Sequence, residues 1–234
     1  MQLTLFYEAD LPDYVALHTL SNDTFKHAVQ VLRLQKGDAL HITNGKGLLC
    51  RAVLITVEKK QAIVQIESIQ FFPASTPKTC IAISLLKNAS RLEWFIEKAT
   101  ELGISAIIPM LCNRTEKQHF RYDRIKTILV SAMLQSKQVW LPELFLPMQF
   151  SEVTTLKNYT TKLIAHCIEN EKIAINNFHF IENTLMLIGP EGDFTEEEIV
   201  LAEKNEFIAV TLGNKRLRTE TAGVAAAVML SLNK

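Results

Sequence analysis

The chain has 234 residues, of which 48% are hydrophobic and 21% are charged, and its 25 basic and 25 acidic side chains give a net charge of zero. This composition is typical of a globular protein that buries a sizeable core, and no apolar run is long enough to span a membrane. The zero net charge excludes the overall basic excess that many nucleic-acid-binding proteins carry, although a balanced total can still contain a basic face.

The start of the chain and its cysteines and histidines favour a cytoplasmic protein. Residues 1–8 lack a basic start followed by an apolar stretch, so we expect no signal peptide. The four cysteines form no CxxC pair, and three lie in apolar, strand-like runs, so we expect reduced thiols in the core. The six histidines show no metal-binding spacing, so we expect no metal site.

The first seventy residues carry the pattern of a short helix followed by strands with tight turns. Apolar residues at helical spacing predict a helix over 22–34, which Asn22 or Asp23 can cap. The Asn-Gly-Lys-Gly signal at 44–47 predicts a hairpin. Three strands are predicted, over 39–43, 48–57 and 62–70. This pattern favours a small β-barrel domain over 1–72, with the boundary in the proline-containing stretch that follows.

From residue 73 to residue 234 the pattern changes to alternating strands and helices. Strands are predicted over 80–86, 104–110, 162–168, 185–188 and 207–212. Helices are predicted over 90–102, 122–138, 195–206 and 221–232. This alternation predicts an α/β domain with a mostly parallel sheet that is covered on both faces.

The loop at 187–195 reads Leu-Ile-Gly-Pro-Glu-Gly-Asp-Phe-Thr and joins a predicted strand to a predicted helix. Loops beyond the ends of strands are where open α/β sheets bind ligands. Thr195 and Glu198 form a capping-box pattern, which fixes the start of the helix. Gly189 and Gly192 permit backbone conformations that other residues avoid. An ordinary strand-to-helix turn explains this loop equally well.

A second loop of this kind, at 212–223, reads Leu-Gly-Asn-Lys-Arg-Leu-Arg-Thr-Glu-Thr-Ala-Gly. Arg218 and Glu220 place a cation and a carboxylate at a helix start, where unsatisfied amides favour polar or anionic groups. The small residues of the helix over 221–232 predict close packing, either against the sheet or against a second copy of the chain. A capped helix with a surface ion pair is the simpler alternative.

Other patterns carry less information. Residues 113–126 hold five basic and two acidic side chains, which fit a nucleic-acid contact or a solvated helix face equally well. The sequence contains no GxxxxGK[ST] phosphate loop, no GxGxxG and no GxSxG nucleophile elbow. These absences disfavour nucleotide hydrolysis, dinucleotide binding and serine-hydrolase chemistry.

Four segments together resemble the ribosomal RNA small subunit methyltransferase E family, which belongs to the SPOUT class. Residues 27–38 are similar to the family's N-terminal signature, and residues 91–103 are similar to its central helix. Residues 188–194 and 212–222 are similar to its two C-terminal cofactor segments. The resemblance covers nearly the whole chain.

The resemblance implies an N-terminal PUA-like β-barrel that helps to bind RNA and a C-terminal SPOUT-type α/β domain with a trefoil knot, an exception to the near-absence of knots. It implies a homodimer that holds S-adenosylmethionine in the loops of the knot. The implied reaction is methylation of N3 of one uridine in 16S rRNA, within the assembled small ribosomal subunit.

The resemblance also implies roles for individual residues. The cofactor-binding candidates are Ile188, Gly189, Pro190, Gly192, Leu212, Gly213, Leu217, Thr219 and Thr221. The RNA-binding candidates are Arg33, Arg91, Lys98 and Arg114. Because the N3 position of a neutral uracil carries a proton, the site needs a base or a cation that favours the uracil anion. Arg218 is the candidate for stabilising negative charge, and Glu220 or Glu191 is the candidate for accepting the proton.

Two positions depart from the family's common pattern. Asp193 stands where a glycine is common, and we expect it to adopt a negative φ and to favour the helix N-terminus. The stretch 135–138 lacks a Gly-Arg pair that the family often carries, and Lys137 is the candidate substitute for that arginine.

Two other functions fit parts of the sequence. A catalytically inactive RNA-binding assembly factor of the same fold fits the neutral charge and the altered stretch at 135–138. A SPOUT enzyme that acts on tRNA is disfavoured by the N-terminal barrel signature. The complete segment at 212–222 favours an enzyme, because a protein that only binds RNA has no need of a cofactor loop.

Overall fold

The computed structural model describes residues 3–116, 119–169 and 171–232, and the chain divides into two compact units. The first unit contains Met1–Ala74 and Met133–Leu141, and the second contains Ser75–Ala132 and Pro142–Lys234. The boundary predicted from the sequence lay between residues 72 and 73. It placed Met133–Leu141 in the C-terminal domain, whereas the structure groups this segment with the N-terminal unit.

Met133–Leu141 belongs to the N-terminal unit because its backbone pairs with the hairpin loop there. The Gly47 N–H donates to the Val139 carbonyl at 2.9 Å, and the Leu141 N–H donates to the Gly45 carbonyl at 2.8 Å. Contacts between residues so far apart in the chain leave no signal in the local pattern.

The N-terminal unit is built around a five-stranded sheet in the order β1-β3-β4-β5-β2. Its strands are β1 (Leu5–Tyr7), β2 (Leu17–Thr19), β3 (Ala39–Thr43), β4 (Leu48–Val57) and β5 (Ala62–Phe71). The pairing of β1 with β3 is parallel and the others are antiparallel. The three predicted strands and the hairpin between the first two are confirmed. The two short strands β1 and β2 were not predicted, because three residues are too few to show alternation.

The predicted helix over 22–34 is helical over its first ten residues. It consists of α1 (Asn22–Phe25) and one turn of π-helix, η1 (Lys26–Val31). Its N-cap is Ser21, not Asn22 or Asp23, since the Ser21 hydroxyl accepts from the Thr24 N–H. The Ser21 hydroxyl and N–H also donate to the buried carboxylate of Glu8, and this contact fixes the position of the cap.

The C-terminal unit contains an eight-stranded sheet in which every pairing among the described residues is parallel. Seven strands follow the order β11-β13-β10-β12-β6-β7-β8, and β9 pairs with β7. Their bounds are β6 (Thr79–Ser84), β7 (Ala106–Leu111), β8 (Glu143–Leu144), β9 (Met148–Gln149), β10 (Thr161–Ala165), β11 (Ile173–Ala174), β12 (Thr184–Ile188) and β13 (Ile208–Thr211). The predicted parallel sheet is therefore confirmed.

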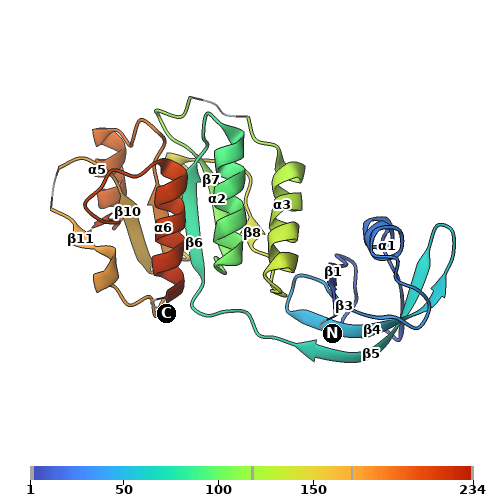
Figure 1. The fold of residues 1–234 in the computed structure, drawn as a ribbon. Helices are drawn as coiled ribbons and strands as arrows, with labels where there is room; N and C mark the ends of the chain where they lie inside the picture. The colour runs from blue at the N-terminus through green and yellow to red at the C-terminus, as the bar shows by residue number, and fades with distance from the viewer. Residues whose placement is uncertain (1–2, 117–118, 170, 233–234) are drawn as a thin grey trace. The chain divides into compact units, whose positions relative to one another are not determined.

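Helices cover both faces of this sheet. They are α2 (Ala89–Glu101), α3 (Tyr122–Gln135), α4 (Phe150–Thr154), α5 (Glu196–Lys204) and α6 (Thr219–Leu232), with a short 3-10 turn, η2 (Ile175–Asn177). Figure 1 shows α2, α3 and α6 side by side on one face of the sheet. Cys80 and Ala82 of β6 belong to the core cluster that contains Phe150 of α4 and Ile199 of α5, so these two helices cover the opposite face.

Close packing of α6 confirms the prediction from its small residues. A Cβ atom on Gly223 would lie 2.6 Å from the ring of Phe95 in α2 and 3.1 Å from Ile83 in β6. The absence of a side chain at Gly223 therefore lets α6 approach α2 and the sheet. Among the described residues, none of the helices has the length and apolar character needed to cross a membrane.

Candidate active site

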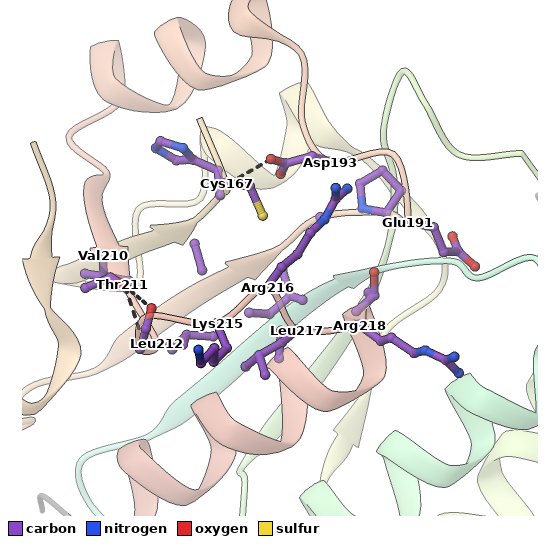
Figure 2. Close-up of a pocket in the computed structure, with 18 of the residues that line it drawn as sticks. Cys167, Glu191, Asp193, Val210, Thr211, Leu212, Lys215, Arg216, Leu217 and Arg218 are labelled. Atoms are coloured by element: carbon purple, nitrogen blue, oxygen red, sulfur yellow. Dashed lines mark hydrogen bonds between the residues drawn. The ribbon is translucent and has the colours of Figure 1, made fainter. Parts of the chain in front are cut away.

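Three neighbouring parallel strands end at one pocket of about 690 Å³. The strands are β13, β10 and β12, and the loops that follow them supply nearly all of the pocket's lining (Figure 2). Because parallel strands bring their carboxyl ends to the same edge of a sheet, loops far apart in the sequence meet here. Both loops singled out in the sequence contribute to this pocket.

The loop after β12 is fixed by the start of α5. The Thr195 hydroxyl accepts from the Glu198 N–H at 3.2 Å, and the Glu198 carboxylate accepts from the Thr195 N–H at 2.9 Å. This confirms the predicted capping box. Gly189 contacts the ring of Phe194, which would lie 3.0 Å from an added Cβ atom. A side chain at Gly189 would therefore disturb the buried Phe194.

Arg114 also holds this loop. Its guanidinium donates to the carbonyl oxygen of Gly192 at 2.7 Å and to that of Phe194 at 3.3 Å. Arg114 was a candidate for RNA binding, and the structure places its side chain against the backbone of the loop after β12.

Asp193 does not adopt the negative φ expected for it, because its φ is +64°. Its carboxylate accepts from the N–H of Cys167 at 2.7 Å and from the N–H of Phe194 at 2.9 Å. Asp is among the few non-glycine residues that adopt the left-handed region when the side chain bonds locally. These two hydrogen bonds are the physical reason for the difference from the expectation.

The loop after β13 supplies most of the positive charge of the pocket. Figure 2 shows Lys215, Arg216 and Arg218 on this loop, with Arg216 reaching toward Asp193 and Cys167. Five basic side chains line the pocket: Arg91, Lys172, Lys215, Arg216 and Arg218. The carboxylates of the described lining are those of Glu191 and Asp193. A chain with zero net charge therefore concentrates positive charge at this site.

Seven of the nine predicted cofactor-binding residues line the pocket. They are Ile188, Gly189, Pro190, Leu212, Gly213, Leu217 and Thr219. Gly192 and Thr221 are not among the described lining residues. Gly192 instead accepts the hydrogen bond from Arg114, and Thr221 is exposed on α6.

The predicted catalytic residues fall into two groups. Arg218 and Glu191 line the pocket. Glu220 lies outside the described lining and is buried, with 7% of its surface exposed. Its Oε1 atom lies 3.6 Å from Nε of Arg91, and its Oε2 atom has no hydrogen-bond partner among the described residues.

The four predicted RNA-binding residues are dispersed. Arg91 lines the pocket from the first turn of α2. Lys98 lies farther along α2 and pairs with Glu97 at 2.7 Å and Glu101 at 2.9 Å. Arg33 lies in the N-terminal unit, after η1, with a φ of +59°. Lys117, one of the basic residues at 113–126, lies outside the described residues.

Residues after β10 were not identified from the sequence, although they form one wall of the pocket. His166, Cys167 and Lys172 line it. The only local signal is a histidine at the end of an apolar strand, which is too common to indicate a site. His166 is 8% exposed, and neither ring nitrogen has a partner among the described residues. Burial lowers the pKa of His166, and the charge of Lys172 lowers it further.

The thiols agree in part with the sequence-based expectation. Cys50, Cys80 and Cys112 are free and buried, whereas Cys167 is free and exposed. The described residues contain no cluster of His, Cys, Asp and Glu side chains that could hold a metal ion.

Comparisons with known families match both units. Residues 74–231 match a family described as RNA methyltransferase domain, and residues 20–67 match one described as RNA methyltransferase PUA domain. These matches and the parallel sheet confirm the predicted fold class, an α/β domain of the SPOUT type preceded by a PUA-like domain.

Individual relatives extend over nearly the full length. The ribosomal RNA small subunit methyltransferase E of Mesomycoplasma hyopneumoniae is 30% identical over 211 residues, which cover 88% of this chain and 89% of the relative. The crystal structure of a probable rRNA-methyltransferase from Porphyromonas gingivalis has a TM-score of 0.88 at 32% identity and covers 96% of this chain and 95% of that one.

A third relative carries a cofactor. The structure of a ribosomal RNA small subunit methyltransferase E from Neisseria gonorrhoeae bound to S-adenosyl methionine has a TM-score of 0.86 at 28% identity. It covers 97% of this chain and 95% of that chain. With both units matched and a relative at 30% identity over most of its length, the chain belongs to the ribosomal RNA small subunit methyltransferase E family.

Proposed function

We propose that this protein transfers the methyl group of S-adenosylmethionine to N3 of a uridine in 16S rRNA of the small ribosomal subunit. The observation that carries the proposal is the pocket itself, in which the two loops that resemble the family's cofactor segments meet. Membership in the family supports an RNA substrate, and the cofactor-bound relative supports S-adenosylmethionine.

The pocket fits S-adenosylmethionine in size and chemistry. Its volume of about 690 Å³ lies in the range of small-molecule sites. The half-buried Leu212 and Leu217 offer apolar surface for an adenine ring, and the backbone at the strand ends offers hydrogen-bonding groups. The buried, unpartnered ring nitrogens of His166 at the pocket wall indicate a polar ligand there.

The basic residues of the pocket fit an RNA substrate. S-adenosylmethionine carries a net positive charge and has no need of five surrounding cations. Arg91, Lys215, Arg216 and Arg218 are therefore assigned to phosphate groups and to the uracil base. This local concentration of positive charge explains how a neutral chain binds a polyanion.

Bound S-adenosylmethionine supplies an electrophilic methyl group, and the side chains of this protein prepare the uracil. As the N3–carbon bond forms and the bond between the methyl carbon and the sulfonium sulfur breaks, the N3 proton must leave the uracil. Glu191 is the carboxylate at the pocket that we assign to receive it, and Arg218 stabilises the negative charge that develops on the uracil oxygens. Glu220 is buried beside Arg91, and we assign it to hold that arginine rather than to accept the proton.

Further features of the proposal come from the family resemblance. We propose that the chain of the C-terminal domain forms a trefoil knot, that the protein is a cytoplasmic homodimer, and that residues 1–72 contribute to RNA binding. Arg33 and Lys98 are assigned to RNA outside the pocket.

The test uses small ribosomal subunits from a strain that lacks the protein. They are incubated with the protein and S-adenosylmethionine, and the digested rRNA is analysed by mass spectrometry for 3-methyluridine. Calorimetric titration with S-adenosylmethionine is measured in parallel. The control variant is Lys204→Ala, which removes a positive charge from α5 outside the described pocket lining.

New 3-methyluridine is the expected result, with the control variant fully active. Cofactor binding without methylation would overturn the assignment of the RNA target. Absence of cofactor binding would overturn the proposed enzyme and would favour the RNA-binding assembly factor.

A further inference from the structure

Asp193 joins two loops that are 26 residues apart in the sequence. Its Oδ2 atom accepts from the Cys167 N–H at 2.7 Å, and its Oδ1 atom accepts from the Phe194 N–H at 2.9 Å. Cys167 and Asp193 both line the pocket. The carboxylate therefore connects two sides of the pocket. Its partner at position 167 is a backbone N–H, which every residue except proline would provide.

The hydrogen bond between Cys167 and Asp193 lies just beyond the carboxyl ends of two paired strands. The strands β10 and β12 are neighbours, and their last paired residues are Ala165 and Ile188. Beyond this pair the ladder ends and the two backbones separate to form the pocket. The hydrogen bond from Cys167 to Asp193 is a link between the two chains beyond the end of the ladder.

The backbone of Asp193 shows that this link is maintained against a conformational preference. A φ of +64° is unfavourable for most residues with a Cβ atom. The Asp193 N–H donates to the carbonyl of Pro190 at 2.9 Å, which closes a turn around Glu191 and Gly192. Arg114 holds the same turn through the Gly192 carbonyl, so Asp193 and Arg114 attach the loop to two different segments.

We propose that Asp193 is a positioning residue that fixes the separation of the loops after β10 and β12 and thereby sets the affinity for S-adenosylmethionine. The proposal rests on the proposed function, since it takes S-adenosylmethionine as the ligand of this pocket. It assigns no contact with the reacting atoms to Asp193. The carboxylate acts by holding Pro190 and Glu191 opposite His166 and Cys167.

Two substitutions distinguish the effect of losing the hydrogen bonds of the carboxylate from the effect of changing the backbone conformation at position 193. Asp193→Gly removes the carboxylate but suits a φ of +64° better than aspartate does. Asp193→Asn retains the shape and tolerates this φ, but it replaces one of the two carboxylate oxygens, each of which accepts one N–H, with an amide NH2 group that cannot accept. The control is Glu182→Gln, which neutralises an exposed carboxylate two residues before β12 and outside the described pocket lining.

Calorimetric titration with S-adenosylmethionine, thermal unfolding and steady-state kinetics are measured for each protein. Asp193→Gly is expected to weaken cofactor binding about tenfold, the effect of losing the charge-assisted hydrogen bond from the Cys167 N–H that links the two loops. Its unfolding temperature is expected to change little, because relief of the positive φ offsets the lost hydrogen bonds and the greater flexibility of glycine. Asp193→Asn is expected to show an intermediate loss. The KM for S-adenosylmethionine is expected to rise in both variants, with kcat at saturation nearly unchanged.

The outcomes separate this inference from the proposed function. If the native protein binds S-adenosylmethionine and Asp193→Gly binds it equally well, the carboxylate does not position the loops and the inference is overturned. A fall in kcat without a change in KM would also overturn it, since that result assigns Asp193 to the chemical step. A native protein that fails to bind S-adenosylmethionine would overturn the proposed function itself.

Discussion

The Nε atom of Arg91 lies 3.6 Å from the Oε1 atom of Glu220, and this ion pair connects the first turn of α2 with the first turn of α6. Arg91 lines the pocket, whereas Glu220 is buried behind it. A buried carboxylate next to a pocket arginine is placed to orient the guanidinium and is poorly placed to collect a proton from a substrate.

The variant Glu220→Gln tests these two roles. We expect it to lower kcat/KM for RNA by about tenfold, because Arg91 loses the charge that orients it. The shape of the pH–rate profile is expected to stay the same, as measured by methyl transfer to small subunits at several pH values. Loss of one limb of that profile would show instead that Glu220 is the base.

Arg114 offers a second test, since it was a candidate RNA contact and its guanidinium donates to two loop carbonyls. We expect Arg114→Ala to raise the KM for S-adenosylmethionine several-fold and to leave the salt dependence of RNA binding unchanged. The measurement is RNA affinity at several salt concentrations beside cofactor titration. If Arg114 instead contacted an RNA phosphate, Arg114→Ala would make the plot of log K for RNA binding against log salt less steep by about 0.7. Cofactor affinity would then be unchanged.

The sequence predicted those elements whose determining interactions lie within a few residues of one another. The strands β3 and β4 were predicted with their observed bounds because alternation over five and ten residues and a glycine turn specify them. The capping box of Thr195 and Glu198 was predicted because its partners are three residues apart. The short strands β8, β9 and β11 have two residues each and offer no periodicity.

Contacts between distant segments account for what the sequence could not show. The φ of Asp193 depends on the N–H of Cys167, 26 residues away, and the position of Arg114 depends on carbonyls 78 and 80 residues away. His166 was missed because its significance comes from burial beside loops after two other strands. The two loops after β12 and β13, which line the pocket, were found because glycines and helix starts mark them locally.

The proposed role of Arg218 predicts a loss in the chemical step. Arg218→Ala is expected to lower kcat about 100- to 1000-fold, the effect of removing one group that stabilises developing charge. Arg218→Lys is expected to recover part of this loss because it retains the charge without the planar guanidinium. Single-turnover methyl transfer at saturating RNA is the measurement. A full rate for Arg218→Ala under these conditions would remove the residue from the mechanism.

The contact of Gly223 with Phe95 predicts a loss of stability. The variant Gly223→Ala adds a Cβ atom 2.6 Å from the fully buried ring of Phe95, so the ring or the helix backbone must shift. Overpacking of this kind lowers the free energy of unfolding by about 1–3 kcal/mol, and alanine's better helix propensity offsets at most about 1 kcal/mol of that loss.

Chemical denaturation measures this difference, and the double variant Gly223→Ala, Phe95→Leu provides the control. A smaller side chain at position 95 makes room for the added methyl group, so the two changes are expected to be less destabilising together than their sum. Simple additivity would show that the two residues are not coupled and would contradict the packing argument.

His166 predicts how stability depends on pH. Burial, followed by the charge of Lys172, lowers its pKa below the ordinary value of 6.5, while the carboxylates of Asp193 and Glu203 act in the opposite direction by less. Well above pH 6.5 the imidazole is neutral in both the folded and the unfolded chains. As the pH falls below this value, the unfolded chain takes up a proton that the folded chain resists, so the free energy of unfolding decreases until the pH reaches the lowered pKa.

The variant His166→Phe isolates this contribution. Because the ring nitrogens have no partner among the described residues, we expect the variant to be at least as stable as the native protein at pH 7. Its stability is expected to fall less between pH 6.5 and acidic pH, with the remaining decrease carried by groups such as His41, whose pKa is lowered by burial and by Arg51. Denaturation at a series of pH values gives the comparison. Equal slopes for the two proteins would show that His166 titrates as freely in the folded chain as in the unfolded one.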